Sequence, residues 1–180
     1  MNALLRIGLL TVSDRASQGI YEDQGGPAMS AWLKKVLLNE IEFCTRIVPD
    51  EIDQITDALG FFTAQGCSLI LTTGGTGPAV RDVTPEATAI FCDRILDGFG
   101  EEMRRASLKV VPTAILSRQI AGTKGQSLII NLPGKPSAIA DCLDAIFAAV
   151  PYCIDLLEGP SFQTDPAVFE CFRPKAKKGQ

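Results

Sequence analysis

Apolar residues follow two alternating patterns along the chain, one typical of strands and one typical of helices. The run of apolar and β-branched residues at 5–13 predicts a strand buried on both faces. Residues 42–49 predict a second strand with partial alternation, and 67–73 predict a third. Between these runs, apolar residues recur every three or four positions over 25–40 and 50–66, the spacing of a helix with one buried face. Strands that alternate with helices predict an α/β fold whose mostly parallel sheet is covered on both faces.

The second half of the chain continues this alternation with less regular signals. Thr84 is suited to a helix N-cap and Pro85 to the first helical residue. The expected elements are a helix over 84–93, a helix over 100–111, extended segments over 113–122 and 126–133 flanking the turn 122–125, and a helix over 136–157 interrupted near Pro151. No linker, repeat or change of composition divides the chain. We therefore expect one domain over 1–160, followed by a wrapping segment and basic tail over 161–180.

The composition narrows the class of protein. A chain of 180 residues, 46% hydrophobic and 21% charged, is large enough to bury a sizeable core. The N-terminus lacks the features of a secretory signal, and the apolar runs fall far short of the ~20 residues of a membrane-spanning helix. We therefore expect a soluble cytoplasmic protein with no membrane partner. The net charge of −4 argues against a nucleic acid partner.

Cysteine and histidine restrict the chemistry. The six cysteines are scattered without a C-x-x-C pair, which favours buried free thiols over a disulfide framework or a metal site. The chain has no histidine, which excludes Ser-His-Asp, Cys-His and histidine-ligated zinc sites built from this chain alone. Proton transfer would depend on carboxylates, Lys, Tyr, Cys or the substrate itself. Chemistry that uses carboxylates, amides and a hard metal ion is therefore favoured.

Polar residues and glycines follow each predicted strand, at the edge where parallel α/β sheets bind their ligands. They are Ser13, Asp14 and Arg15 after the first strand, Pro49, Asp50 and Glu51 after the second, Gly74, Gly75, Thr76, Gly77, Arg81 and Asp82 after the third, and Pro133, Gly134, Lys135 and Pro136 after the last. Their convergence predicts a ligand site. Purely structural interpretations exist for Asp50 as a helix N-cap, for Ser13 with Asp14 and Pro133 with Gly134 as turns, and for Arg81 with Asp82 as a solvated pair.

The glycine loop of residues 74–77 gives the most specific signal. Glycines directly after a strand allow close approach of a ligand to the backbone, and successive N–H groups form a nest that binds anions. The loop lacks the G-x-x-x-x-G-K-[ST] pattern of P-loop proteins. It also lacks the third glycine of the dinucleotide fingerprint, since position 80 is Val. We expect a phosphate ligand at a loop of another kind.

Five segments together resemble the molybdenum-cofactor biosynthesis family, which includes the bacterial MogA and MoaB proteins and the G domains of gephyrin and its plant counterpart. They are TVSDRAS at 11–17, VPDE at 48–51, LTTGGTGPAVRDVTPEAT at 71–88, AILSR at 114–118 and INLPGKPSAI at 130–139. The resemblance spans roughly residues 5–160. Further stretches, among them RIGLLTVSDRAS and FGEEMRRASL, resemble the MogA branch, the molybdopterin adenylyltransferases.

The resemblance implies a three-layer α/β/α sandwich that assembles as a homotrimer. It also implies that ATP and molybdopterin react, with Mg²⁺, to give adenylyl-molybdopterin and pyrophosphate, and that the product passes to a separate molybdenum-inserting protein. By the same resemblance, Asp50 and Asp82 would be the catalytic residues and Mg²⁺ ligands. The expected substrate-binding residues are Ser13, Asp14, Gly74, Gly75, Thr76, Gly77, Arg81, Ser117, Arg118, Pro133, Gly134 and Lys135. Lys135 departs from many relatives, which carry a neutral residue there.

Two other functions stay open at this point. The resemblance to gephyrin permits a carrier or scaffold that binds molybdopterin without adenylating it. A related nucleotide-binding enzyme, of the kind seen in CinA-type domains, is the third hypothesis. For the quaternary structure, the apolar residues of 97–116 are suited equally to an interface and to the core.

Overall fold

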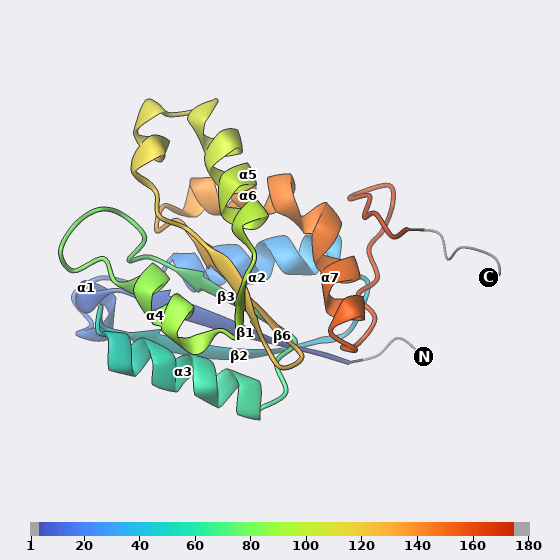
Figure 1. Cartoon of the computed structure of the whole chain (residues 1–180), viewed down its shortest axis with the longest axis horizontal. Helices are drawn as coiled ribbons and strands as arrows, with labels where there is room; N and C mark the ends of the chain where they lie inside the picture. Colours follow the sequence, from blue (N-terminus) through green and yellow to red (C-terminus); the bar gives the residue numbers. More distant parts are fainter. Residues whose placement is uncertain (1–3, 175–180) are drawn as a thin grey trace.

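The computed structural model describes residues 4–174 and builds one six-stranded sheet (Figure 1). The strands are β1 (Leu5–Val12), β2 (Ile41–Val48), β3 (Leu69–Thr73), β4 (Arg94–Ile95), β5 (Ala121–Lys124) and β6 (Ser127–Leu132). Their order across the sheet is β2-β1-β3-β6-β5-β4. The first four in this order are parallel, and β5 and β4 run antiparallel to their neighbours. The predicted α/β fold with a mostly parallel sheet is confirmed.

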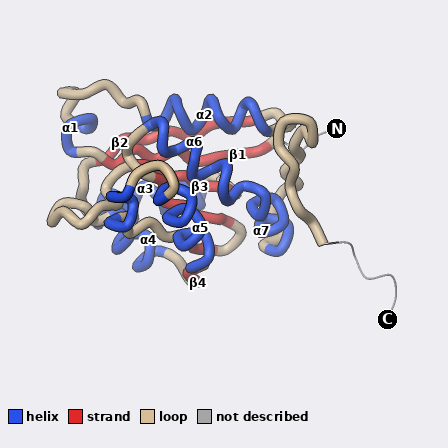
Figure 2. Tube along the Cα trace, turned by 90° about the horizontal axis from the view of Figure 1, so that it is seen from above, coloured by secondary structure: helices blue, strands red, loops and turns tan. Residues whose placement is uncertain are grey.

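Helices cover both faces of the sheet, which gives three layers (Figure 2). They are α1 (Asp14–Ser17), α2 (Gly25–Val36), α3 (Ile52–Ala64), α4 (Thr84–Phe91), α5 (Asp97–Leu108), α6 (Pro136–Ile146) and α7 (Val150–Leu156), with 3-10 helices η1 (Pro112–Leu116) and η2 (Phe147–Ala149). Helices α3 and α4 pack on one face, and α2 and α6 pack on the other. The parallel strands therefore end at one common edge, between two helical layers.

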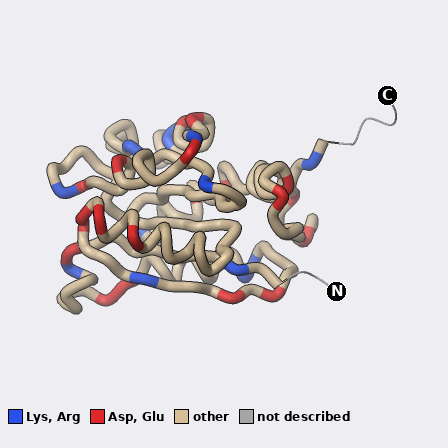
Figure 3. The backbone as a smooth tube through the Cα atoms, turned by 60° about the horizontal axis from the view of Figure 1, so that its bottom comes forward, with Lys and Arg blue, Asp and Glu red and all other residues tan. Residues whose placement is uncertain are grey.

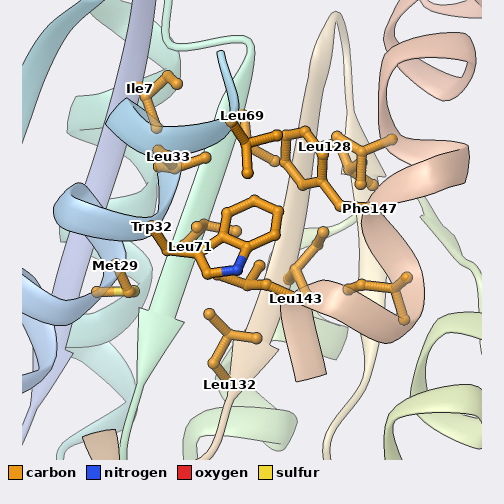
Figure 4. Packing of buried hydrophobic residues seen from close by; sticks show 14 of the residues in the cluster. Ile7, Met29, Trp32, Leu33, Leu69, Leu71, Leu128, Leu132, Leu143 and Phe147 are labelled. Atoms are coloured by element: carbon orange, nitrogen blue, oxygen red, sulfur yellow. The ribbon is translucent and has the colours of Figure 1, made fainter. Parts of the chain in front are cut away.

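The larger of two apolar cores lies between the sheet and helices α2 and α6 (Figure 4). Trp32 of α2 occupies its centre and packs edge-on against Phe147, with the ring centroids 4.8 Å apart. The indole Nε1–H donates to the Asp144 carboxylate over 2.9 Å, so the polar atom of this ring is satisfied. On the opposite face, Ile55 and Phe62 of α3 pack against the sheet in the second core.

The chain beyond residue 159 lies against the connection from α2 to β2. Leu38 N–H donates to the Gln163 carbonyl over 2.9 Å, and Leu37 forms a single antiparallel bridge with Thr164. Phe162 is fully buried in the larger core. Residues up to 174 thus wrap the domain, while residues 175–180, most of the expected basic tail, lie outside the described part of the chain.

Several local predictions were wrong. The segment 113–122 was expected to be extended, but Pro112–Leu116 forms a 3-10 helix, since the fixed φ of proline suits a first helical turn. Helix α5 begins at Asp97 rather than at 100, and α2 ends at Val36 rather than at 40. Thr84 is not the N-cap of α4, because Val83 has that position and the Thr84 hydroxyl binds a loop carbonyl instead.

The apolar segment Pro136–Leu156 also corrects an expectation. It is 21 residues long with a mean hydropathy of 1.5, which by length and composition is enough to cross a membrane. The prediction that apolar runs fall far short of that length is therefore wrong. The segment forms α6, η2 and α7, and the predicted interruption near Pro151 is confirmed. Leu143, Phe147 and Ile154 are fully buried in the larger core, so burial accounts for the apolar composition.

The close packing of Gly8 on β1 gives a prediction about stability. A Cβ at Gly8 would lie 2.8 Å from Cγ of the buried Phe62 ring, which has no room to move. We expect Gly8→Ala to lower the free energy of unfolding by about 1–3 kcal/mol through overpacking. A Cβ at Gly98 in α5 meets nothing within 4 Å. Gly98→Ala is the control and should raise stability by about 0.5–1 kcal/mol.

Urea unfolding followed by the fluorescence of Trp32, the single tryptophan of the chain, measures both variants. Equal midpoints for Gly8→Ala and the unchanged protein would contradict the proposed packing of β1 against Phe62.

Candidate functional site

The predicted site residues meet at the carboxyl edge of the sheet. Ser13 follows β1 and caps α1, since its Oγ accepts from the Ala16 N–H over 3.2 Å. Asp14 and Asp50 follow the neighbouring strands β1 and β2 and bind each other's backbone. The Asp14 N–H donates to Asp50 Oδ2 over 2.9 Å, and the Asp50 N–H donates to Asp14 Oδ1 over 3.1 Å. Two loops far apart in sequence are joined at this point.

The interpretation of Asp50 as a helix N-cap is wrong. Glu51 is the N-cap of α3, and its side chain makes no capping bond. The Asp50 carboxylate is turned instead toward the loop that precedes α1 and toward the glycine loop. The Asp50 side chain therefore does not cap α3, the helix that follows it.

Arg81 connects the loop after β3 to this pair of loops. Its Nε and one terminal nitrogen donate to the two oxygens of Asp14 over 3.0 and 2.8 Å, and its other terminal nitrogen donates to Glu51 over 2.7 Å. The guanidinium lowers the pKa of the Asp14 carboxyl below its ordinary value, and the bond to Asp14 contributes most to a raised pKa of Arg81. Both side chains are partly exposed, so the contribution to stability is small.

Asp50 lies in a different environment. Burial raises the pKa of its carboxyl above the ordinary value, and the negative charges of Asp14 and Asp82 raise it further. The Asp14 N–H and the charge of Arg81 oppose this shift. The influence of Asp82 on Asp50 places the two predicted catalytic carboxylates within electrostatic reach of each other.

The glycine loop lies directly against both aspartates. Gly74 and Gly75 have φ of 95° and 64°, values that glycine adopts without strain. A Cβ at Gly75 would lie 2.9 Å from Asp50 Oδ1, and one at Gly77 would lie 2.8 Å from Asp82 Oδ2. A Cβ at Gly74 would lie 2.2 Å from the Val12 carbonyl oxygen. Larger residues would therefore displace the carboxylates or the end of β1.

The backbone N–H groups of this loop differ in their partners. The Gly74 N–H donates to the Leu132 carbonyl at 3.4 Å. Within residues 4–174, no hydrogen bond to the protein occupies the N–H groups of Gly75, Thr76 and Gly77. Three successive free amides on a loop with positive φ have the arrangement of an anion-binding nest.

Asp50 and Asp82 are the candidate ligands for the predicted magnesium ion. Asp50 Oδ2 accepts from the Asp14 N–H and Asp82 Oδ2 from the Ala79 N–H, and the other oxygen of each carboxylate has no hydrogen bond among the described residues. Residues 4–174 contain no cluster of three or more His, Cys, Asp or Glu side chains with metal-binding geometry. Two carboxylates are what Mg²⁺ commonly takes from a protein, with water and phosphate oxygens completing its shell.

A pocket of about 180 Å³ opens beside the glycine loop. Its lining combines the predicted Ser13, Gly74 and Gly134 with further residues. Among these are Thr73, whose hydroxyl adjoins the predicted phosphate loop, and Thr11, Tyr21, Asp23 and Gly25, which the sequence pattern does not mark as site residues. Asp23 Oδ1 accepts from the Thr11 hydroxyl and from the N–H groups of Gly25 and Gly26, so it caps α2. An acidic residue two positions before the glycine pair of a helix start was the signal for it.

A second, more open groove of about 620 Å³ lies on the other side of the loops, lined by Asp50, Glu51 and Arg81 among others. Thr11 and Asp23 also line a third groove, of about 680 Å³, between α2 and β2. Asp50 and Gly74 therefore line two different depressions of this edge, whereas Asp82, Gly75, Thr76 and Gly77 line none of the three.

The remaining predicted residues differ in their placement. Pro133 lies behind Gly74, since its carbonyl accepts from the Thr73 hydroxyl over 2.8 Å. Arg118 contacts the glycine loop, whereas the Ser117 hydroxyl donates to Gln119 and lines none of these depressions. Lys135 is exposed and makes no described side-chain bond, although it precedes α6 beside the pocket residue Gly134. Substrate-binding roles for these residues stay predictions.

Comparison with known proteins shows the family of the chain. The family model described as "Probable molybdopterin binding domain" matches residues 8–152. The chain belongs to this family. It is 50% identical to the protein named molybdopterin adenylyltransferase of Haemophilus influenzae, over 99% of this chain and 97% of that one. Identity to the protein of the same name in Helicobacter pylori is 55%, over 95% and 98%.

Solved structures agree with the fold. The molybdopterin biosynthesis enzyme MoaB of Thermus thermophilus superposes with a TM-score of 0.80 at 39% identity, covering 88% of this chain and 99% of that one. The three-layer α/β/α architecture expected from the resemblance is therefore confirmed.

The raised pKa of Asp50 predicts an effect of pH on stability. Its ionised form is disfavoured in the folded protein, so this cost is present above the raised pKa and is lost as the pH falls below the ordinary aspartate value. Asp50→Asn removes the charge and should therefore increase the free energy of unfolding at pH 7. The gain should disappear near pH 3.

Urea titrations at both pH values measure this, with Asp57→Asn on the exposed side of α3 as the control. A lower stability of Asp50→Asn than of the unchanged protein at pH 7 would show that the carboxylate is held favourably and would contradict the argument.

Proposed function

We propose that this chain is a molybdopterin adenylyltransferase of molybdenum-cofactor biosynthesis. It transfers AMP from ATP to the phosphate of molybdopterin, giving adenylyl-molybdopterin and pyrophosphate. The observation that supports this best is the nest of three free amides, those of Gly75, Thr76 and Gly77, flanked by the Asp50 and Asp82 carboxylates. The names of the bacterial relatives at 50–55% identity agree with it.

The reaction suits a chain without histidine. A phosphate oxygen of molybdopterin, already ionised at neutral pH, forms a bond to the α-phosphorus of ATP. The bond from this phosphorus to the bridging oxygen breaks, and pyrophosphate leaves with the electron pair. No proton has to be removed from the nucleophile, so a general base is unnecessary. The difficulty is to bring two anions together, which is a task of positioning and charge compensation.

The glycine loop performs the positioning in this proposal. Free N–H groups donate to phosphate oxygens at fixed positions, and because the loop is already shaped, little reorganisation is needed when charge shifts in the transition state. The absence of side chains at Gly75 and Gly77 lets phosphate and carboxylates approach the same backbone. Arg81 holds Asp14 and Glu51, so its positive charge stays near the reacting groups.

Asp50 and Asp82 are the proposed ligands of Mg²⁺. When bound, the ion supplies positive charge that compensates the phosphate oxygens during transfer. The side chains present fit this role, since each carboxylate keeps one oxygen free of protein hydrogen bonds and both lie against the loop.

A pyrophosphate-release assay tests the function. The unchanged protein should release pyrophosphate from ATP only when molybdopterin and Mg²⁺ are both added. Asp82→Asn keeps the size of the side chain but removes its charge, and it should lower the rate at least ~100-fold. Asp141→Asn on the exposed face of α6 should leave the rate unchanged.

The assay also separates the alternatives. Binding of molybdopterin without any pyrophosphate would indicate a carrier or scaffold, and nucleotide hydrolysis without molybdopterin would indicate a different nucleotide enzyme. Full activity of Asp82→Asn would remove this carboxylate from the mechanism.

We also propose a cytoplasmic homotrimer that passes its product to a molybdenum-inserting protein. Leu108, Val110, Val111, Ile115 and Leu116 are all more than 40% exposed on the segment that includes the end of α5 and η1. This cluster supports a contact between copies of the chain, because large apolar patches commonly mark interfaces.

Light scattering measures this assembly. The unchanged protein should give three times the 19.3 kDa mass of one chain. Ile115→Glu places a charge in the cluster and should shift the mass toward one chain, whereas Ile20→Glu, at an equally exposed apolar residue outside the cluster, should not. A single-chain mass for the unchanged protein would contradict the proposal.

A further inference from the structure

Arg118 binds the glycine loop at several points along its length. Its backbone N–H donates to the Thr76 carbonyl over 2.9 Å, and its side-chain Nε donates to the Gly77 carbonyl over 2.7 Å. One terminal nitrogen donates to the Asp82 carbonyl, and the other pairs with the Glu86 carboxylate on α4. Each nitrogen of the guanidinium thus has a partner in the loop or in the helix that follows it.

These bonds determine which way the loop amides point. A peptide unit is planar, and its C=O and N–H point in opposite directions. The Thr84 hydroxyl and N–H bind the carbonyls of Gly74 and Gly75, and the Arg118 N–H binds that of Thr76. Three successive carbonyls are therefore held by Thr84 and Arg118. The N–H groups of the same peptide units, the three free amides of the nest, each point away from the partner of the carbonyl in their own unit.

We propose that Arg118 is a positioning residue that acts through the glycine loop and Asp82, rather than a group that binds the substrate. Its guanidinium fixes the backbone on both sides of Asp82, because it holds the carbonyl of Asp82 itself and that of Gly77. The Asp82 carboxylate then closes the loop by accepting from the Ala79 N–H over 2.9 Å. Loss of the guanidinium would release the loop that carries both the nest and the carboxylate.

The planar fork of arginine is required for this role. Lysine has one nitrogen on a flexible stem and cannot reach two carbonyls and a carboxylate in fixed directions. Arg81 on the same edge makes a different set of bonds, since all its described partners are carboxylate oxygens. The two arginines therefore differ in role: Arg81 binds side chains, and Arg118 binds mainly backbone carbonyls.

Hydrogen exchange tests the proposal without any assay of activity. In Arg118→Lys, the amides of Ala79, Asp82 and Thr84, which are hydrogen-bonded inside the loop, should exchange about tenfold faster. The matched control is Arg173→Lys, because Arg173 also donates to a carbonyl and a carboxylate but lies far from the loop in sequence and contacts Phe162 and Asp155. The control should leave the exchange of these amides unchanged.

Kinetics give the second measurement, which rests on the proposed adenylyl transfer. Arg118→Lys should lower kcat about 10- to 100-fold, while KM for ATP and for molybdopterin stays within about threefold. Added guanidinium ion should raise the kcat of Arg118→Ala about tenfold.

Two results would overturn the proposal. Unchanged exchange in Arg118→Lys would show that the guanidinium does not hold the loop. A raised KM with unchanged kcat would show that Arg118 binds substrate directly. If the unchanged protein shows no transfer, the proposed function fails, and the exchange measurement still decides the role of Arg118.

Discussion

The site depends on the way in which one short loop uses its backbone carbonyls. Gly74, Gly75 and Thr76 would each have to expose or bury a polar carbonyl, and an unpaired buried one is costly. Thr84 and Arg118 satisfy all three. The N–H groups of the same peptide units have no hydrogen-bond partner within residues 4–174. Positive φ at the two glycines is the conformational condition for this arrangement, and the anion nest is its consequence.

The parallel sheet determines what lies beside that nest. Strands β1, β2 and β3 end at one edge, and each supplies one loop that carries an aspartate, namely Asp14, Asp50 or Asp82. The reciprocal bonds between Asp14 and Asp50 join two of these loops through backbone amides. Arg81 joins the third loop to them through side chains. These bonds offset part of the repulsion among the three carboxylates. Burial, followed by the charges of Asp14 and Asp82, still raises the pKa of Asp50.

The sequence predicts the layers of the fold well because burial is periodic. Continuous apolar runs mark the central strands, and spacing of three or four residues marks α2 and α3. The segment after α5 is predicted less well. The pattern places Val110 and Val111 in a helix over 100–111 and Ile115 in an extended segment, but α5 ends at Leu108 and Ile115 lies in a 3-10 helix. All three side chains are exposed. A pattern of apolar residues does not reveal whether the protein's own core or another surface covers them.

The site was predictable where its polar residues and glycines directly follow the carboxyl ends of the parallel strands. Asp50, Asp82 and the glycines lie together as that rule predicts. The sequence predicts Thr84 as a helix cap because threonine is common at helix N-caps. Its hydroxyl instead binds the carbonyl of Gly74, ten residues earlier, and no local pattern indicates this contact. Asp23 was missed for a related reason. It precedes a helix by two residues, like an ordinary cap, and only the folded sheet brings Thr11 and the pocket to it.

Because the chain has no histidine, catalysis at this edge depends strongly on the contacts that position the loop. In an enzyme with a general base, proton transfer by a positioned side chain supplies part of the rate. A chain that joins two anions without such a base depends on orientation and fixed charge, and effects of this kind are lost with displacements of about 1 Å. Residues that hold the backbone are then as important for the rate as residues that touch the substrate. Bonds such as those of Arg118 to the carbonyls of Gly77 and Asp82 therefore belong to the catalytic design of this edge.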